Sequence, residues 1–158
     1  MKFRRLNNQA MSPKSVVLIL GGAGAQNSTV TKALSTSGAY TIHLLTRSTL
    51  SSHTAELGYL PNIKLIEGDC YNEKYLTSAF KGVDLCFVNT NGFAIDEKNE
   101  IYWGIRIYEI ARWSGIKHFL YSFLQHVTKN RDFNPKRRVP FVDKKAKVTR
   151  RSPHATRS

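Results

Sequence analysis

The chain has 158 residues, enough for one globular domain, and its apolar fraction of 41% excludes an intrinsically disordered protein. No apolar run approaches the roughly 18 residues that a membrane-spanning helix needs, so no membrane partner is expected. The net charge of +13 is unevenly placed, because residues 129–158 hold 11 Lys and Arg against two Asp.

Strand-like and helix-like segments alternate through the first four fifths of the chain. Short apolar runs predict strands over residues 16–20, 41–46, 63–66, 84–88 and 117–121. Apolar residues at helical spacing predict helices over residues 28–37, 49–57, 73–80 and 97–114. In the last helix, Ile101, Ile105 and Tyr108 form the expected apolar face, with Ala111 near it, and Gly115 is the expected C-terminal cap. This order predicts an α/β fold, a doubly wound, Rossmann-like parallel sheet of about five strands.

Both ends of the chain lack this alternation. Residues 1–14 start with charge and have no apolar stretch behind it, which predicts a flexible extension and not a signal peptide. The folded domain is therefore expected over residues 15–128. Residues 129–158 are basic and unpatterned, and we expect a largely unstructured tail.

The cysteines and histidines do not predict a metal site. Cys70 and Cys86 match no metal-binding or redox spacing, and the five histidines are scattered. Buried free thiols are typical of a reducing compartment, so we expect the cytoplasm or, alternatively, the nucleus.

A glycine-rich turn follows the first predicted strand. It reads Gly21-Gly22-Ala23-Gly24-Ala25-Gln26-Asn27 and opens the first predicted helix. A dinucleotide-binding fold needs glycine here for a tight turn, for close approach of the backbone to pyrophosphate, and for packing of the helix near the strand. Asn27 occupies the place of the third glycine. The strand–turn–helix context favours dinucleotide binding, and the alternative is a simple glycine turn.

The residues after the second predicted strand bear on the type of cofactor. An Asp or Glu at this point would bind the ribose 2′-hydroxyl of NAD, whereas this chain has Thr46-Arg47-Ser48. An arginine can grip the 2′-phosphate of NADP with two hydrogen bonds. Arg47 therefore favours NADP(H), and the alternative is an ordinary surface arginine.

Six segments in order give the chain a family resemblance. They are VVLILGGAGAQN, LLTRS, LIEGDC, FVNTN, EIARWSGIKHFLYS and VPFVDKKAKV, within roughly residues 15–148. Together they resemble the NmrA-like family, an atypical branch of the short-chain dehydrogenases. The resemblance implies a Rossmann fold that binds NADP(H). It also implies either a redox-sensing regulator with little or no catalysis, or a reductase of small molecules near the isoflavone-reductase branch.

The resemblance assigns roles to residues of this chain. It implies that the turn holds the pyrophosphate through Gly21, Gly22, Ala23, Gly24, Ala25, Gln26 and Asn27. Arg47 would hold the 2′-phosphate, and Asp69 and Cys70 would lie by the adenine. The nicotinamide-side ribose would pass Asn89, Thr90 and Asn91, and Lys145 would reach the cofactor.

The chain departs from the catalytic pattern of the short-chain dehydrogenases. Those enzymes reduce carbonyls with a Tyr-x-x-x-Lys pair, whose tyrosine supplies the proton. Counting back from Lys145 gives Phe141, which has no ionisable group, and Ser122 stands where the reductases keep a serine. Family members also continue well past this length, so we expect a C-terminally truncated chain whose last ten residues are not family sequence.

Three functions are therefore compared. The missing tyrosine favours an NADP(H)-binding regulator, which would report redox state through a protein partner. Lys145 and Ser122 keep an NADPH-dependent oxidoreductase open as the alternative. Nucleic-acid binding through the basic tail is a second alternative. An uncovered sheet edge would also allow self-association.

Overall fold

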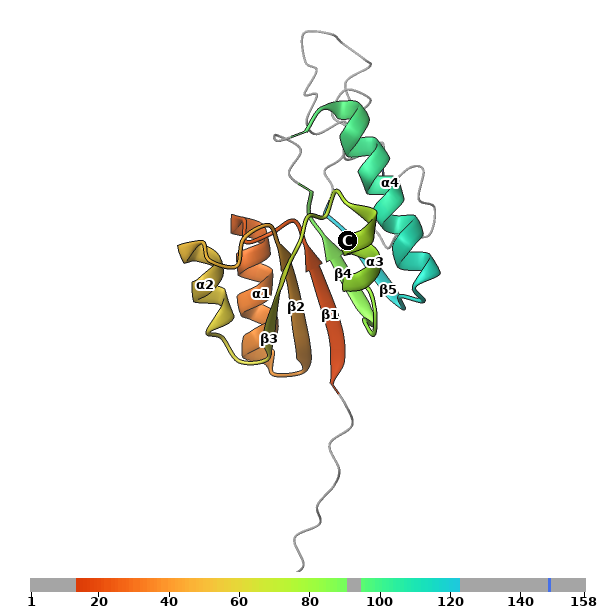
Figure 1. Ribbon diagram of the computed structural model, residues 1–158. Coiled ribbons are helices and arrows are strands. Elements are labelled where there is room, and N and C mark those ends of the chain that lie inside the picture. The colour runs from red at the N-terminus through yellow and green to blue at the C-terminus, as the bar shows by residue number, and fades with distance from the viewer. Residues whose placement is uncertain (1–13, 91–94, 123–147, 149–158) are drawn as a thin grey trace, which may run out of the picture.

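The computed structural model describes residues 14–90, 95–122 and 148. The described part is a five-stranded sheet with four helices, and all neighbouring strands are parallel (Figure 1). The strands are β1 (Ser15–Leu20), β2 (Tyr40–Thr46), β3 (Ile63–Glu67), β4 (Leu85–Val88) and β5 (His118–Tyr121). The helices are α1 (Ala25–Ser37), α2 (Ser52–Gly58), α3 (Glu73–Ala79) and α4 (Glu97–Trp113). The predicted α/β Rossmann-like sheet of five strands is confirmed.

The sheet order β3-β2-β1-β4-β5 places the first strand in the middle. The chain leaves β1 toward β2 on one side and later crosses back to β4 on the other side, so the strand order reverses beside β1. Ligands of open α/β sheets bind outside the carboxyl ends of the strands at such a switch point.

Helices cover both faces of the sheet and enclose two apolar clusters. Figure 1 shows α1 and α2 on one side and α3 and α4 on the other. Val17 and Ile19 of β1 pack on the side of α1 and α2, whereas Leu18 and Leu20 pack on the side of α3 and α4. This alternation is why β1 reads as a continuous apolar run, since side chains of a strand point to opposite faces in turn.

Two helix starts differ from the sequence-based predictions. The first helix begins at Ala25 and not at residue 28, because the glycine turn ends directly in the helix with Gly24 as its N-cap. The second begins at Ser52 and not at residue 49, so residues 47–51 form a loop over the carboxyl end of β2. Both shifts lie at the same edge of the sheet, where the pocket described below is formed.

Helix α4 buries a face one residue removed from the predicted one. Ile101, Ile105 and Tyr108 are only partly buried, whereas the buried positions are Glu100, Gly104, Ile107, Ile110 and Ala111. Ala111 was expected near the predicted face, and Ile101 and Tyr108 of that face pack against the apolar cluster from its edge. Glu100 and Gly104 were missed because a glutamate and a glycine are not apolar markers. Gly115 has φ of +78° immediately after the helix, as expected for a C-terminal cap glycine.

Val148 is the one residue of the predicted basic tail that the structure describes. Its side chain is buried in the cluster under α4, and a Cβ built on Gly104 would lie 2.6 Å from its Cγ1 atom. The glycine therefore makes room for this valine on the helix. The other tail residues, 129–147 and 149–158, and the N-terminal residues 1–13 lie outside the described residues. None of the helices in the described ranges is long and apolar enough to cross a membrane.

Candidate cofactor-binding site

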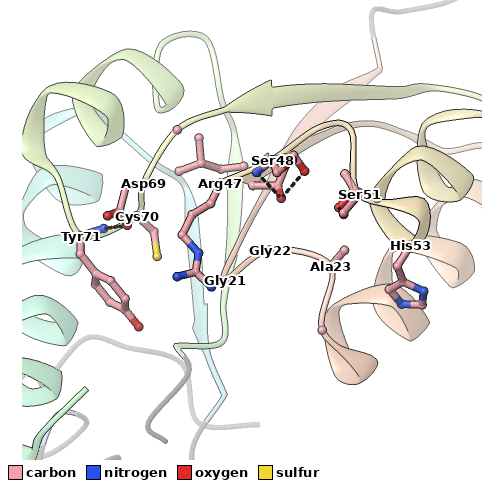
Figure 2. Close-up of a pocket in the computed structure, with 15 residues that line it drawn as sticks. Gly21, Gly22, Ala23, Arg47, Ser48, Ser51, His53, Asp69, Cys70 and Tyr71 are labelled. Carbon is pink, nitrogen blue, oxygen red and sulfur yellow. Dashed lines mark hydrogen bonds between the residues drawn. The ribbon is translucent and has the colours of Figure 1, made fainter. Parts of the chain in front are cut away.

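A pocket of about 410 Å³ lies at the carboxyl ends of β1, β2 and β3 (Figure 2). It brings together four features that the sequence predicted separately, namely the glycine turn, Arg47, Asp69 and Cys70. The residues that line it are Gly21, Gly22, Ala23, Gly24, Leu45, Thr46, Arg47, Ser48, Ser51, His53, Thr54, Gly68, Asp69, Cys70 and Tyr71.

Gly21 and Gly24 have different structural roles in the turn. Gly21 has φ of +110°, and a Cβ there would lie 2.0 Å from the carbonyl oxygen of Asn89, so only glycine fits against the end of β4. Gly24 has an ordinary φ of −63°, and a Cβ built on it would meet no atom of the described residues within 4 Å. The absent Cβ of Gly24 therefore leaves open space in front of α1. The N-cap residue Gly24 has no side chain to cap this 13-residue helix, and its first backbone N–H groups can therefore receive an anion.

Asn27 holds the turn from inside the protein. Its side chain is 1% exposed, and its Nδ2 donates to the carbonyls of Gly22 (2.9 Å) and Leu20 (3.2 Å). It stands at the position where the dinucleotide fingerprint has a third glycine. The amide therefore fastens the turn to the end of β1, and this support could not be predicted from a pattern that records only a missing glycine.

Arg47 is the exposed cation of the pocket. The hydroxyl of Thr46 donates to the carbonyl of Ser48 at 3.2 Å and so shapes the loop that carries Arg47. Figure 2 shows the Arg47 side chain extending toward the glycine turn beside Cys70. Arg47 forms no ion pair with any residue in the described ranges. Its guanidinium therefore faces the pocket with its hydrogen-bonding capacity open to a ligand.

His53 and Ser28 connect α2 to the glycine turn. The His53 Nε2 lies 3.0 Å from the Ser28 Oγ, and that hydroxyl donates to the carbonyl of Ala23 at 2.9 Å. Since the Ser28 proton is committed to Ala23, the His53 Nε2 is the donor in this pair. Sequence reasoning missed His53, because its partner is 25 residues away and no motif spans the two.

Asp69, Cys70 and Tyr71 form the opposite wall. The Asp69 Oδ1 accepts a hydrogen bond from the backbone N–H of Tyr71 at 2.9 Å, which fixes the turn after β3. Burial, and secondarily the charge of Asp69, raises the pKa of the Cys70 thiol to about 12, although its backbone hydrogen bond and Arg47 act in the other direction. The thiol stays protonated at neutral pH and therefore serves as a weakly polar surface and not as a nucleophile. The Tyr71 ring packs against the Trp103 ring of α4 in a tilted arrangement, with ring centroids 6.0 Å apart.

On the far side of the turn, the ends of β4 and β5 meet the start of α1. The Ser122 hydroxyl donates to Gln26 Oε1 at 3.4 Å, so Ser122 lies at the rim of the turn. Thr90 is 3% exposed, and its hydroxyl contacts Glu100 Oε1 (3.0 Å) and the Tyr121 hydroxyl (2.9 Å). The Thr90 side chain thus faces the protein interior, so this residue would offer its backbone to a ligand. Glu100 and Tyr121 were not singled out in the sequence.

Three residues of the expected site lie outside the described part of the chain. They are Asn91, which was expected beside the nicotinamide-side ribose, and Phe141 and Lys145, which occupy the Tyr-x-x-x-Lys positions. The basic clusters considered for nucleic-acid binding lie there as well.

The fold and the pocket together define a class of protein. A parallel sheet whose order reverses at β1, a glycine turn at that point, and an uncapped helix behind it make a Rossmann-like domain of the kind built around dinucleotides. The chain belongs to the NmrA-like family, whose model matches residues 13–153. This finding confirms the resemblance stated from the sequence. Because the match runs to residue 153, the expectation that the last ten residues are not family sequence is wrong for residues 149–153.

Individual relatives carry different descriptions. The NmrA-like family domain-containing oxidoreductase himF of Aspergillus japonicus is 30% identical over 111 residues, which are 68% of this chain and 33% of that protein. NmrA, a negative transcriptional regulator, was solved in complex with NADP and matches with a TM-score of 0.68 at 22% identity, over 87% of this chain and 42% of that chain. The NAD complex of NmrA matches with a TM-score of 0.67 at 21% identity, over the same shares of the two chains.

The structural matches show a common fold. The chain spans 33% and 43% of the lengths of two curated relatives that it matches.

Proposed function

We propose that this chain binds NADP(H) in the described pocket and acts as a regulatory, redox-sensing cofactor binder. The environment of Arg47 supports the choice of NADP(H). Its side chain is exposed, has no ion pair in the described ranges, and lies on the pocket wall that faces the glycine turn. A planar guanidinium recognises a phosphate with paired hydrogen bonds and gains little from a ribose hydroxyl.

The residues present fit such a cofactor. The open space at Gly24 and the uncapped start of α1 suit the pyrophosphate, with Ala25 and Gln26 offering the first helical N–H groups. Arg47 and Ser48 would hold the 2′-phosphate, and Asp69 and Cys70 would lie along the adenine. The strand end at Asn89 and Thr90, continued by Asn91, and the side chain of Lys145 would contact the nicotinamide half.

When bound, the nicotinamide ring accepts or supplies a hydride. Reduction of a carbonyl also needs a proton donor. In this chain the tyrosine of the Tyr-x-x-x-Lys pair is replaced by Phe141, which carries no proton to give. This replacement supports a binder over an enzyme. NmrA, which has a similar fold, is described as a negative transcriptional regulator, and this also supports a regulatory role.

The oxidoreductase function is the second candidate, favoured by Ser122 at the end of β5 and by the relative himF, which is described as an oxidoreductase. Under that reading Ser122 and Lys145 would be the catalytic residues. In either case we place the chain in the cytoplasm or the nucleus, since Cys70 and Cys86 are free thiols suited to a reducing compartment.

Calorimetric titration of the chain with NADPH and NADH tests the cofactor proposal. We expect NADPH to bind at least about tenfold more tightly, because a charge-assisted bidentate contact is worth about 1.5–3 kcal/mol. Arg47→Ala should remove that difference and leave NADH affinity unchanged. Arg112→Ala, an exposed arginine at the end of α4, is the matched control and should keep the wild-type preference. Equal wild-type affinities would contradict the NADP(H) assignment.

The regulatory role is tested by following NADPH absorbance in the presence of small carbonyl compounds and isoflavone-like acceptors. No consumption above the buffer rate supports the binder. Turnover that is lost in Ser122→Ala or Lys145→Ala supports the oxidoreductase in its place.

A further inference from the structure

Glu100 is an acidic residue in an unexpected environment. It lies in the first turn of α4 and has no exposed surface. Within the described ranges, the buried polar set otherwise contains only neutral Asn, Ser and Thr side chains. Removing a carboxylate from water is expensive unless hydrogen bonds compensate, so a glutamate here points to a role that an apolar residue could not fill.

The carboxylate ends a short chain of hydrogen bonds across three elements. The Thr90 hydroxyl, just after β4, donates to Glu100 Oε1 at 3.0 Å. The Tyr121 hydroxyl, at the end of β5, lies 2.9 Å from the Thr90 Oγ1. A threonine hydroxyl has one proton, and Thr90 gives it to Glu100, so Tyr121 donates to Thr90. Burial raises the pKa of Tyr121, which keeps the phenol protonated as this direction requires.

This chain of bonds fixes the strand end against the glycine turn. The residue before Thr90 is Asn89, whose N–H donates to the carbonyl of Leu20 at 3.1 Å. The Asn89 carbonyl lies so close to Gly21 that a Cβ on Gly21 would be 2.0 Å away. A shift of Thr90 would therefore be transmitted to the turn through Asn89.

The position of the network separates it from the pocket itself. Thr90, Tyr121 and Glu100 do not line the 410 Å³ pocket that holds Arg47, Asp69 and Cys70. They lie under the ends of β4 and β5, where a dinucleotide laid across the turn would place its second half. The same residues could thus affect one half of the cofactor and spare the other.

We propose that Glu100 is a positioning residue, which holds the Thr90 hydroxyl and with it the end of β4 in place for the nicotinamide half of the cofactor. This inference rests on the proposed NADP(H) binding. A glutamate suits the task because its carboxyl oxygen Oε1 accepts the Thr90 hydrogen bond from the first turn of α4. Glu100 thereby fixes the direction of both hydroxyls and joins α4 to the two strand ends.

The test compares NADPH with adenosine 2′,5′-bisphosphate, which carries the adenosine and the 2′-phosphate but no nicotinamide half. Thr90→Val removes the hydroxyl at nearly constant shape and should weaken NADPH binding about tenfold, the effect of losing a hydrogen bond between buried groups. Binding of the bisphosphate should stay within about twofold of wild type, since Arg47 and the adenine wall are untouched. Thr90→Ser keeps the hydroxyl and should restore NADPH affinity.

Thr31→Val is the matched control. Thr31 is an equally buried threonine of α1 whose hydroxyl donates to the carbonyl of Asn27 at 2.6 Å. Its loss should lower the melting temperature without changing the ratio of the two affinities. Should Thr90→Val fail to fold, Glu100→Gln keeps the shape, replaces one carboxyl oxygen with an NH2 group, and is measured in the same way.

The outcomes separate the two proposals. A wild-type chain that binds neither ligand overturns the proposed function. A wild-type chain that binds both ligands, with an unchanged affinity ratio in Thr90→Val and Glu100→Gln, overturns the positioning role and leaves NADP(H) binding in place. A selective loss of NADPH affinity that Thr90→Ser restores supports the positioning role.

Discussion

The side-chain amide of Asn27 donates a hydrogen bond to the backbone carbonyl of Gly22 over 2.9 Å, from within the helix that the turn opens. A second bond from the same Nδ2 reaches the carbonyl of Leu20 at 3.2 Å. The residue that breaks the glycine fingerprint is therefore the residue that holds the turn together. In this chain the backbone carbonyls of the turn are satisfied by a side chain at the place where other sequences have no side chain.

This relationship predicts that restoring the third glycine of the fingerprint lowers the stability of the folded protein. Asn27→Gly removes both hydrogen bonds and introduces a flexible residue into the first turn of α1, so the free energy of unfolding should fall by about 1–3 kcal/mol. Urea denaturation of wild type and variant measures the change. Thr29→Ala, which removes an exposed hydroxyl from the same turn of the helix, is the control and should have a small effect. An Asn27→Gly variant as stable as wild type would show that the amide contributes nothing to the turn.

Gly21 and Gly24 should respond in opposite ways to the same substitution. Gly21→Ala would place a Cβ 2.0 Å from the Asn89 carbonyl oxygen in a backbone with φ of +110°, so we expect loss of folding. Gly24→Ala has open space and an ordinary φ, so the melting temperature should stay near wild type while NADPH affinity falls. Thermal melting and titration of both variants check the pair. Retained affinity in Gly24→Ala would contradict close approach of the pyrophosphate at this residue.

The sequence was sufficient for the order of elements, because continuous apolar runs and helical spacing are local signals. The sequence also indicated that the glycine turn and Arg47 lie at the carboxyl ends of neighbouring strands, since each directly follows a predicted strand. The side-chain hydrogen bonds that support the site could not be predicted from the sequence. His53 meets Ser28 across 25 residues, and Tyr121 meets Thr90 across 31, so neither pair leaves a motif in the chain. Glu100 was missed for a different reason, because hydrophobic periodicity treats a charged residue as a mark of the exposed face.

Trp103 should report occupation of the pocket. Its ring lies 6.0 Å from that of Tyr71, a pocket-lining residue, whereas Trp113 is 71% exposed with the Arg106 guanidinium 5.0 Å from its ring. These are the two tryptophans of the chain. In Trp113→Phe, saturation with NADP⁺, which does not absorb Trp emission, should change the fluorescence of Trp103. In Trp103→Phe the remaining emission should stay constant. A response carried by Trp113 alone would mean that the ligand does not bind against Tyr71.

Asp84 ties the amino-terminal ends of three strands together. Its Oδ2 accepts from the backbone N–H of Val16 in β1 at 2.9 Å, and its Oδ1 accepts from the Lys117 ammonium, next to β5, at 2.7 Å. The hydrogen bond from Lys117, and after it the bond from Val16, lowers the pKa of the Asp84 carboxyl. The ionised form is therefore the one that the folded protein favours.

Because the folded-state pKa of Asp84 is lowered, its contribution to stability is present above the ordinary Asp pKa of about 3.9 and is lost as the pH falls through the lowered value. Asp84→Asn should thus be less stable than wild type at pH 7, and the difference should shrink steadily as the pH falls below about 4. Urea midpoints measured across this range test the prediction, with Glu56→Gln on the exposed side of α2 as a control that keeps the wild-type pH dependence. A difference between wild type and Asp84→Asn that is constant with pH would mean that the carboxylate charge does not hold these strands.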